Sequence, residues 1–128
     1  HGDAPSREFA AALPIPQRWG MRVIAKRFLR EYPYEPMYLL KHARRFREAV
    51  DMPLILLGGI TDRTGMDTAM AEGFEFVAMG RALLKEPDLI NRIAANPETK
   101  STCTHCNRCM PTIYTRTHCV LAEPALYQ

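Results

Sequence analysis

Four cysteines, the residues of this chain best suited to metal or redox chemistry, lie close together near its carboxyl end. Cys103, Cys106 and Cys109 have the spacing C-x₂-C-x₂-C, and Cys119 follows after nine further residues. Such a run lets one loop wrap a corner of a 4Fe–4S cluster, and four thiolates also satisfy tetrahedral zinc. The residues alone leave three interpretations open: a cluster, a zinc site, or thiols without a metal.

Two general observations bear on these interpretations. Structural zinc sites usually arrange their ligands as two well-separated pairs, whereas these cysteines form one run, with His105 and His118 as alternative nitrogen ligands. A disulfide is the least favoured state, because clustered cysteines without a secretory signal are typical of a reducing cytoplasm. We therefore expect a cytoplasmic protein.

The composition is that of a soluble domain, and it narrows the range of partners. A hydrophobic fraction of 47% and a charged fraction of 24% are typical of globular proteins. The net charge of +3 is too small to indicate a nucleic-acid partner, and no apolar run approaches the ~20 residues that cross a bilayer. The chain begins at His1 rather than at a methionine, which suggests a fragment or a processed piece. We expect a small-molecule substrate, no nucleic acid and no membrane, and a homo-oligomer stays open.

The hydrophobic pattern predicts helices that alternate with short strands. Residues 1–17, which contain three prolines, are predicted to form a loop. Residues 54–57 form an unbroken apolar run, typical of a strand buried on both faces, and residues 74–79 form a second strand. The expected helices cover residues 18–30, 37–50, 64–72 and 82–96, with Thr61 or Asp62 as the cap of the third and Pro87 at a helix start in the fourth.

This order of elements is typical of parallel α/β structure. Two strands are too few to close a sheet, so the chain either takes strands from another chain or is the end of a larger barrel. We favour the second interpretation. The predicted fold is α/β, consisting of about the last two βα units of a TIM (β/α)₈ barrel, followed by a Cys-rich loop and tail.

Both predicted strands are followed by glycine, in the motifs Gly58-Gly59 and Gly80-Arg81. Ligands of parallel α/β sheets bind at the carboxyl ends of the strands, where glycine lets backbone N–H groups approach a phosphate. Arg81 adds donors suited to phosphate, and we expect the helix after each strand to direct its positive end to the same place. Barrels often bind phosphate after strands seven and eight. The two motifs together predict a phosphate cradle.

The run "PLILLGGITDRTGMDTAMAEGFEFVAMGRALLKEPDLINRI" closely resembles the last two strands of the old yellow enzyme-like NADH:flavin oxidoreductase family. These FMN-containing barrels include 2,4-dienoyl-CoA reductase and trimethylamine dehydrogenase. The resemblance is strong over residues 37–93, continues through "CTHCNRC", and is looser over the first 36 residues. It implies that residues 1–97 are the carboxyl-terminal part of an FMN-binding barrel and that residues 98–128 are a Cys-rich extension and tail.

The resemblance also implies roles for individual residues. Ile60 and Met79 either line the flavin pocket or pack within the barrel. Relatives that carry a cluster place 4Fe–4S just after strand eight, where these cysteines lie, although their last cysteine comes a few residues later than Cys119. The family binds the FMN phosphate through positions that correspond here to Gly58, Gly59, Gly80 and Arg81.

The family passes a hydride from NAD(P)H through FMN to an activated alkene or related acceptor, with catalytic residues from earlier strands. We therefore expect an FMN-dependent NAD(P)H oxidoreductase in which this chain supplies the phosphate end of the FMN site, contains no catalytic residue, and is inactive alone. The alternative function is a small cysteine-rich Fe–S or zinc-binding module for electron transfer or structure. Such a module has no need of two glycine-ended strands.

Overall fold

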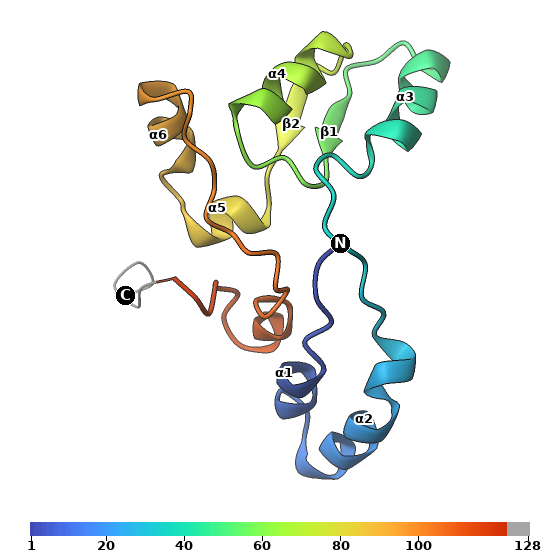
Figure 1. Ribbon diagram of the computed structural model, residues 1–128. Coiled ribbons are helices and arrows are strands. Elements are labelled where there is room, and N and C mark those ends of the chain that lie inside the picture. The colour runs from blue at the N-terminus through green and yellow to red at the C-terminus, as the bar shows by residue number, and fades with distance from the viewer. Residues whose placement is uncertain (123–128) are drawn as a thin grey trace. The chain divides into compact units, whose positions relative to one another are not determined.

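The computed structural model describes residues 1–122 (Figure 1). They form two compact units, each of which we name by its content. The α/β unit consists of Tyr34–Thr102. The helical unit consists of His1–Pro33 together with the described residues that follow the α/β unit.

A pair of parallel strands lies at the centre of the α/β unit (Figure 1). β1 (Ile55–Leu57) pairs with β2 (Phe76–Ala78) in a register that places Leu57 beside Ala78. A helix connects the two strands, as parallel pairing requires. The helices of this unit are α3 (Leu40–Ala49), α4 (Arg63–Ala71), α5 (Arg81–Lys85) and α6 (Leu89–Ala95).

One face of this sheet carries the core of the α/β unit. Leu56, the central residue of β1, is 1% exposed, while its two neighbours in the strand point to the other face. Side chains of α4, α5 and α6 complete the same buried cluster. Its members are Leu56, Ile60, Ala69, Phe74, Met79, Ala82, Leu89 and Ile93. Because Ile60 and Met79 lie just beyond the two strands, the core also fixes the segments into which the strands lead.

The opposite face of the sheet is apolar and exposed. Ile55 and Phe76 are each 58% exposed, and Leu57 is 52% exposed. In the described residues the sheet has only these two strands, so each strand also has an edge without a partner. Apolar sheet faces and unpaired edges are normally covered by further protein. The α/β unit therefore has the form of a piece of a larger sheet.

A carboxylate network anchors the chain where it leaves the α/β unit. Glu86 accepts hydrogen bonds from Ser101 Oγ (2.6 Å) and from the N–H of Thr102 (2.7 Å), and it forms an ion pair with Arg92. Lys85 Nζ donates to the carbonyl oxygen of Thr102 at 2.6 Å. Burial alone would raise the pKa of Glu86, but these hydrogen bonds outweigh burial and hold the pKa below its usual value. The residues that precede the cysteines are thus fixed to the α/β unit.

Two antiparallel helices and a short 3₁₀ helix form the helical unit (Figure 1). α1 (Ser6–Ala11) and α2 (Ile15–Phe28) pack against each other, with Ala10 and Ala25 buried, and the side chains at positions 26 and 28 are not described. The 3₁₀ helix η1 (Met110–Tyr114) packs against α1. The cysteine segment therefore belongs to the same unit as the first residues of the chain.

The beginning of the chain differs from its predicted structure. The sequence predicts a loop over residues 1–17, but α1 lies within this range and α2 begins at Ile15. The prediction took Pro16 as a sign of a loop. Pro16 instead lies in the first turn of α2, where its missing N–H breaks no helical hydrogen bond. The helix predicted from residue 18 is confirmed, with an earlier start.

Of two predictions about where helices begin, the structure confirms one and contradicts the other. Asp62 caps α4, as expected for one of two candidates, because its carboxylate accepts the N–H of Gly65 at 2.9 Å. The expectation that Pro87 begins a helix is wrong. Asp88 is the N-cap of α6, which starts at Leu89, and α5 already ends before Pro87.

The predicted parallel α/β character is confirmed, and the barrel stays a prediction because the described residues hold two strands. The predicted domain boundary between residues 97 and 98 also stays a prediction. The compact units divide the chain elsewhere, after Pro33 and after Thr102, since the Glu86 network holds residues 101 and 102 in the α/β unit. None of the helices between residues 1 and 122 combines the length and apolarity that crossing a membrane requires.

Replacing Glu86 by Gln should destabilise the protein at neutral pH. The amide keeps the shape of the carboxylate but loses the charge-assisted hydrogen bonds, at a cost of about 1 kcal/mol or more. A carboxylate with a depressed folded pKa stabilises the fold above its unfolded pKa, and this stabilisation is lost as pH falls through the folded pKa. Urea unfolding should therefore show a difference from wild type that vanishes in acid.

The exposed Glu98, replaced by Gln, provides the control for this experiment and should change little. Equal unfolding free energies of wild type and the Glu86 variant at neutral pH would contradict the anchoring role of Glu86.

Candidate functional site

The two glycine motifs lie at the same edge of the sheet. Because the last residues of β1 and β2 are paired with each other, the chain leaves the two strands side by side, into Gly58-Gly59 and Gly80-Arg81. This edge is the carboxyl end of a parallel pair, where ligands of α/β proteins bind. The structure thus places all four residues of the predicted phosphate cradle at one edge. Their binding of a phosphate stays a prediction.

The conformation of the backbone explains the first glycine pair. Gly58 and Gly59 have φ angles of +103° and +78°, in the left-handed region that favours glycine. A Cβ on Gly59 would lie 2.8 Å from the carbonyl oxygen of Glu35, which is closer than packed atoms allow. Tyr34 Oη donates to the carbonyl of Gly59 at 2.9 Å and holds the preceding loop against this turn. Packing of that loop is a sufficient reason for glycine here.

Within the described residues, neither packing nor a left-handed backbone explains why position 80 is a glycine. Its φ is −86°, which other residues adopt, and a Cβ at this position would meet no heavy atom within 4 Å. Gly80 is the N-cap of α5, and no side chain caps this helix. Arg81, the first residue of α5, is half-buried. Gly80 and Arg81 therefore combine open space and a positive charge at the sheet edge.

The helix that follows β1 offers no uncapped amino end to this edge. One carboxylate oxygen of Asp62 accepts the N–H of Gly65, and the other lies 3.8 Å from Lys100 Nζ. The expectation that the helices after both strands direct their positive ends to a ligand stays a prediction, and for α4 the cap weakens it. The carboxylate of Asp62 already compensates the positive end of this helix.

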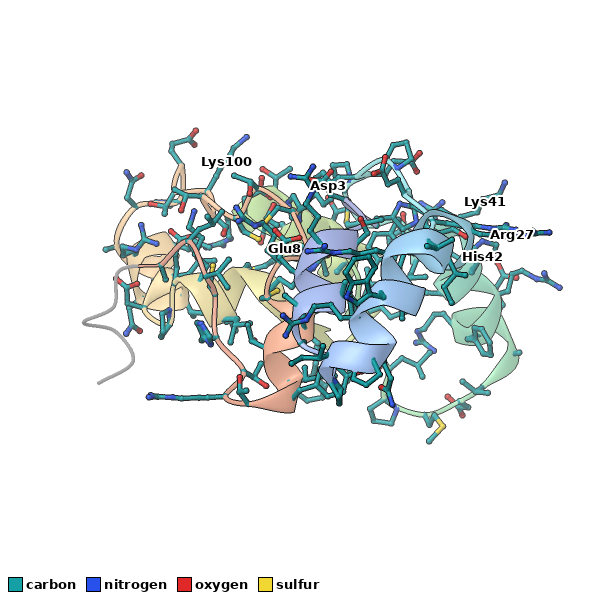
Figure 2. The ribbon with its side chains drawn as sticks, turned by 90° about the horizontal axis from the view of Figure 1, so that it is seen from below. Asp3, Glu8, Arg27, Lys41, His42 and Lys100 are labelled. Carbon is teal, nitrogen blue, oxygen red and sulfur yellow. The ribbon has the colours of Figure 1, made fainter. Side chains whose placement is uncertain are left out.

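The residues that flank the glycine motifs are buried in the core, whereas His42 lies on the surface. Ile60 and Met79 are members of the buried cluster, which favours barrel packing as their role. His42 is exposed on α3, where Figure 2 labels it together with its neighbour Lys41. The hydrogen bond from Tyr34 to Gly59 had no signal in the sequence, because the two residues lie 25 positions apart.

The cysteine segment is held against the first residues of the chain. Asn107 Nδ2 donates to the carbonyl of Asp3 at 2.8 Å, and the N–H of Asp3 donates to the carbonyl of His105 at 3.2 Å. Arg108 forms an ion pair with Glu8 at 2.9 Å. Figure 2 labels Asp3 and Glu8, the two residues of the beginning of the chain that make these contacts. The beginning of the chain thereby fixes the backbone on both sides of the second cysteine.

All four cysteines are reduced thiols with half-buried side chains. Among residues 1–122, no three Cys, His, Asp or Glu side chains are grouped so that they could hold a metal ion. This arrangement gives no support to the 4Fe–4S or zinc site predicted from the cysteine spacing. The spacing shows that one loop contains the thiols. Whether their sulfur atoms lie close enough to bind one metal depends on the conformation of the backbone between them. The residues concerned are Cys103, Cys106, Cys109 and Cys119.

Comparison with known proteins gives two matches. Residues 19–100 match the NADH:flavin oxidoreductase / NADH oxidase family. The 4,4'-dithiodibutanoate disulfide reductase of Rhodococcus erythropolis is 46% identical over 122 residues, which cover 95% of this chain and 30% of the relative. The chain thus spans less than a third of the length of this relative. No solved structure matches the chain significantly.

Substitution by alanine should destabilise the protein at Gly59 and have little effect at Gly80. Gly59→Ala forces a Cβ into the left-handed region and against Glu35, so we expect a loss of about 1–3 kcal/mol of stability. Gly80→Ala should change stability by less than about 0.5 kcal/mol, because its Cβ enters open space. Urea unfolding of the two variants beside wild type measures this difference. A loss at Gly80 as large as that at Gly59 would contradict the assignment of open space at Gly80.

Proposed function

Because this chain belongs to the NADH:flavin oxidoreductase / NADH oxidase family, we propose that it forms the phosphate end of the FMN site of a flavin-dependent oxidoreductase. The observation that carries the proposal is the common edge at which both strands lead into glycine motifs. Gly58-Gly59 shapes the turn after β1, and Gly80-Arg81 adds space and charge after β2. When bound, FMN supplies the two-electron carrier between NAD(P)H and an acceptor.

The residues at this edge suit a phosphate in their donor chemistry. A phosphate monoester is a dianion that requires hydrogen-bond donors and room to approach them. The N-cap of α5 is Gly80, without a side-chain cap, and among the described residues no heavy atom lies within 4 Å of the place that a Cβ on Gly80 would take. The guanidinium group of Arg81 can donate two parallel hydrogen bonds to one phosphate. We assign the charge neutralisation to Arg81 and the backbone approach to Gly80.

We assign the α/β unit to the last two βα units of a (β/α)₈ barrel. The exposed face made by Ile55, Leu57 and Phe76 supports this assignment, because inward-pointing apolar residues of alternating strands fill the interior of such a barrel. The unpaired strand edges would pair with neighbouring strands of the same barrel. Catalytic residues would then come from strands outside this chain. A cytoplasmic location belongs to the same proposal.

We propose an organic disulfide as the acceptor, since the name of the Rhodococcus relative specifies such a substrate. Two electrons and two protons convert one disulfide to two thiols, so NAD(P)H with one further proton balances the reaction. An activated alkene, the acceptor expected from the family resemblance, also takes two electrons and two protons. A small metal-binding module is less well supported, because no metal ligands are grouped within residues 1–122.

Arg81→Ala should weaken FMN retention. Loss of one charged donor to a phosphate costs about 1.5–3 kcal/mol, which corresponds to a ten- to hundred-fold rise in the Kd of FMN. The Kd of the Arg81→Lys protein should lie between those of wild type and the alanine variant, because lysine keeps the charge and loses the paired donors. Fluorescence titration of the apoprotein of the full-length parent with FMN measures both.

Arg63→Ala is the matched control for this titration. Arg63 is likewise the first residue of a helix after a strand, but it is exposed and pairs with Asp67 at 2.8 Å. Its replacement should leave the Kd unchanged. An Arg81→Ala protein that binds FMN as tightly as wild type would rule out the assigned role of Arg81.

Steady-state oxidation of NAD(P)H by the full-length parent distinguishes the two acceptors. We expect 4,4'-dithiodibutanoate to support faster turnover than an activated alkene such as cyclohexenone. Thiol release, followed with a colorimetric thiol reagent, should match the NAD(P)H consumed. Turnover with the alkene alone would overturn the disulfide assignment while leaving the flavin assignment intact.

A further inference from the structure

We propose that Cys109 and Cys119 form a reversible dithiol–disulfide pair that reacts with organic disulfides by thiol–disulfide exchange. The proposal rests on the proposed function for its substrate class, and it assigns a role to a segment outside the flavin-phosphate site. Both side chains are reduced and half-buried, so they are partly accessible to a small disulfide.

One hydroxyl group connects the backbones of these two cysteines. Thr112 Oγ1 donates to the carbonyl of Cys109 at 2.7 Å and accepts the N–H of His118 at 3.1 Å. It also lies 3.3 Å from the carbonyl oxygen of His118, the atom that precedes Cys119 in the backbone. The nine residues between the cysteines are thereby folded into a closed turn.

Further hydrogen bonds stabilise the same turn. The N–H of Thr112 donates to the carbonyl of Cys109 at 3.2 Å, within the 3₁₀ helix η1, and η1 packs on α1. After the turn, the N–H of Ala122 donates to the carbonyl of Cys119 at 3.2 Å. Ordering the chain between two cysteines normally opposes disulfide formation through lost entropy, and these hydrogen bonds already order part of that chain in the reduced state.

The backbone disfavours the rival pair Cys106 and Cys109. Residues i and i+3 are neighbours on the surface of a helix, an arrangement that can bring the two thiols of a C-x₂-C motif together. Asn107, which lies between them, has a φ of +55°, and His105 on the other side of Cys106 has a φ of +58°. The hydrogen bond from Asn107 Nδ2 to Asp3 holds this left-handed conformation. Cys106 and Cys109 therefore do not lie on one continuous right-handed helical turn.

The exchange reaction balances without any further reagent. The thiolate of Cys109 attacks one sulfur of the substrate disulfide, the S–S bond breaks, and one thiol product leaves. The thiolate of Cys119 then attacks the sulfur of Cys109 in the mixed disulfide and releases the second thiol product. The protein pair loses two electrons and two protons, and the substrate gains them. A second exchange, with two molecules of a low-molecular-weight thiol, returns the pair to the reduced state and releases the disulfide of that thiol.

Peptide mapping of the full-length parent tests the proposal. The reduced protein, without NAD(P)H and without oxygen, is treated with 4,4'-dithiodibutanoate, quenched with an alkylating reagent and analysed by mass spectrometry. We expect a Cys109–Cys119 disulfide and two released thiols for each disulfide consumed. A bridge between Cys106 and Cys109, or adducts confined to Cys103 and Cys106, would overturn the proposed pairing.

Two sets of variants sharpen this result. Cys119→Ser should retain a mixed disulfide on Cys109, and the matched Cys103→Ser should still form the internal bridge. Thr112→Val removes the hydroxyl with little change of shape and should slow closure of the bridge several-fold. Thr117→Val, an exposed site in the same loop, should not. Mapping of the wild-type protein needs no variant, so it remains decisive if a variant fails to fold.

Reduction of the bound flavin by NAD(P)H, measured in parallel, separates this proposal from the proposed function. Normal flavin reduction without a Cys109–Cys119 bridge would overturn only the dithiol. A bridge in a protein that binds no flavin would support the dithiol and overturn the flavin site.

Discussion

The parallel pairing of β1 with β2 is the interaction on which the rest of this structure depends. It covers one face of the sheet with the core around Leu56 and leaves the opposite apolar face exposed. The same pairing sends both strands toward one edge, where they enter the glycine motifs. The packing of the α/β unit and the position of the candidate ligand site thus have one cause, because paired parallel strands end at the same edge of the sheet.

The glycines at this edge have different physical origins. Gly58 and Gly59 satisfy a left-handed turn against the loop that Tyr34 holds, and they would be needed in a protein without any ligand. Gly80 has a negative φ of −86°, outside the left-handed region that favours glycine, and open space around its missing side chain. Within this edge, Gly80 and Arg81 are therefore the residues whose identities a phosphate explains best. The distinction also separates residues that support the site from those that would contact its ligand.

The sequence was most informative where local chemistry determines structure. The apolar run around Leu56 indicates a buried strand, and Asp62 before a helical pattern indicates a cap, because both effects depend on adjacent residues. Long-range packing left weaker signals. The loop against Gly59 depends on residues 25 positions away, and the turn between Cys109 and Cys119 depends on one threonine hydroxyl. The cysteine spacing could suggest a cluster, but it could not show how the backbone turns between the thiols.

The central claim is that this chain holds the phosphate of a flavin, and the affinities of FMN and riboflavin for the full-length apoprotein test it most directly. The two ligands share the ring system and ribityl chain and differ only in the phosphate. We predict that FMN binds at least about a hundred-fold more tightly, since a dianion that gains a charged donor and backbone N–H groups contributes roughly 3 kcal/mol or more. Equal affinities for FMN and riboflavin would contradict the account.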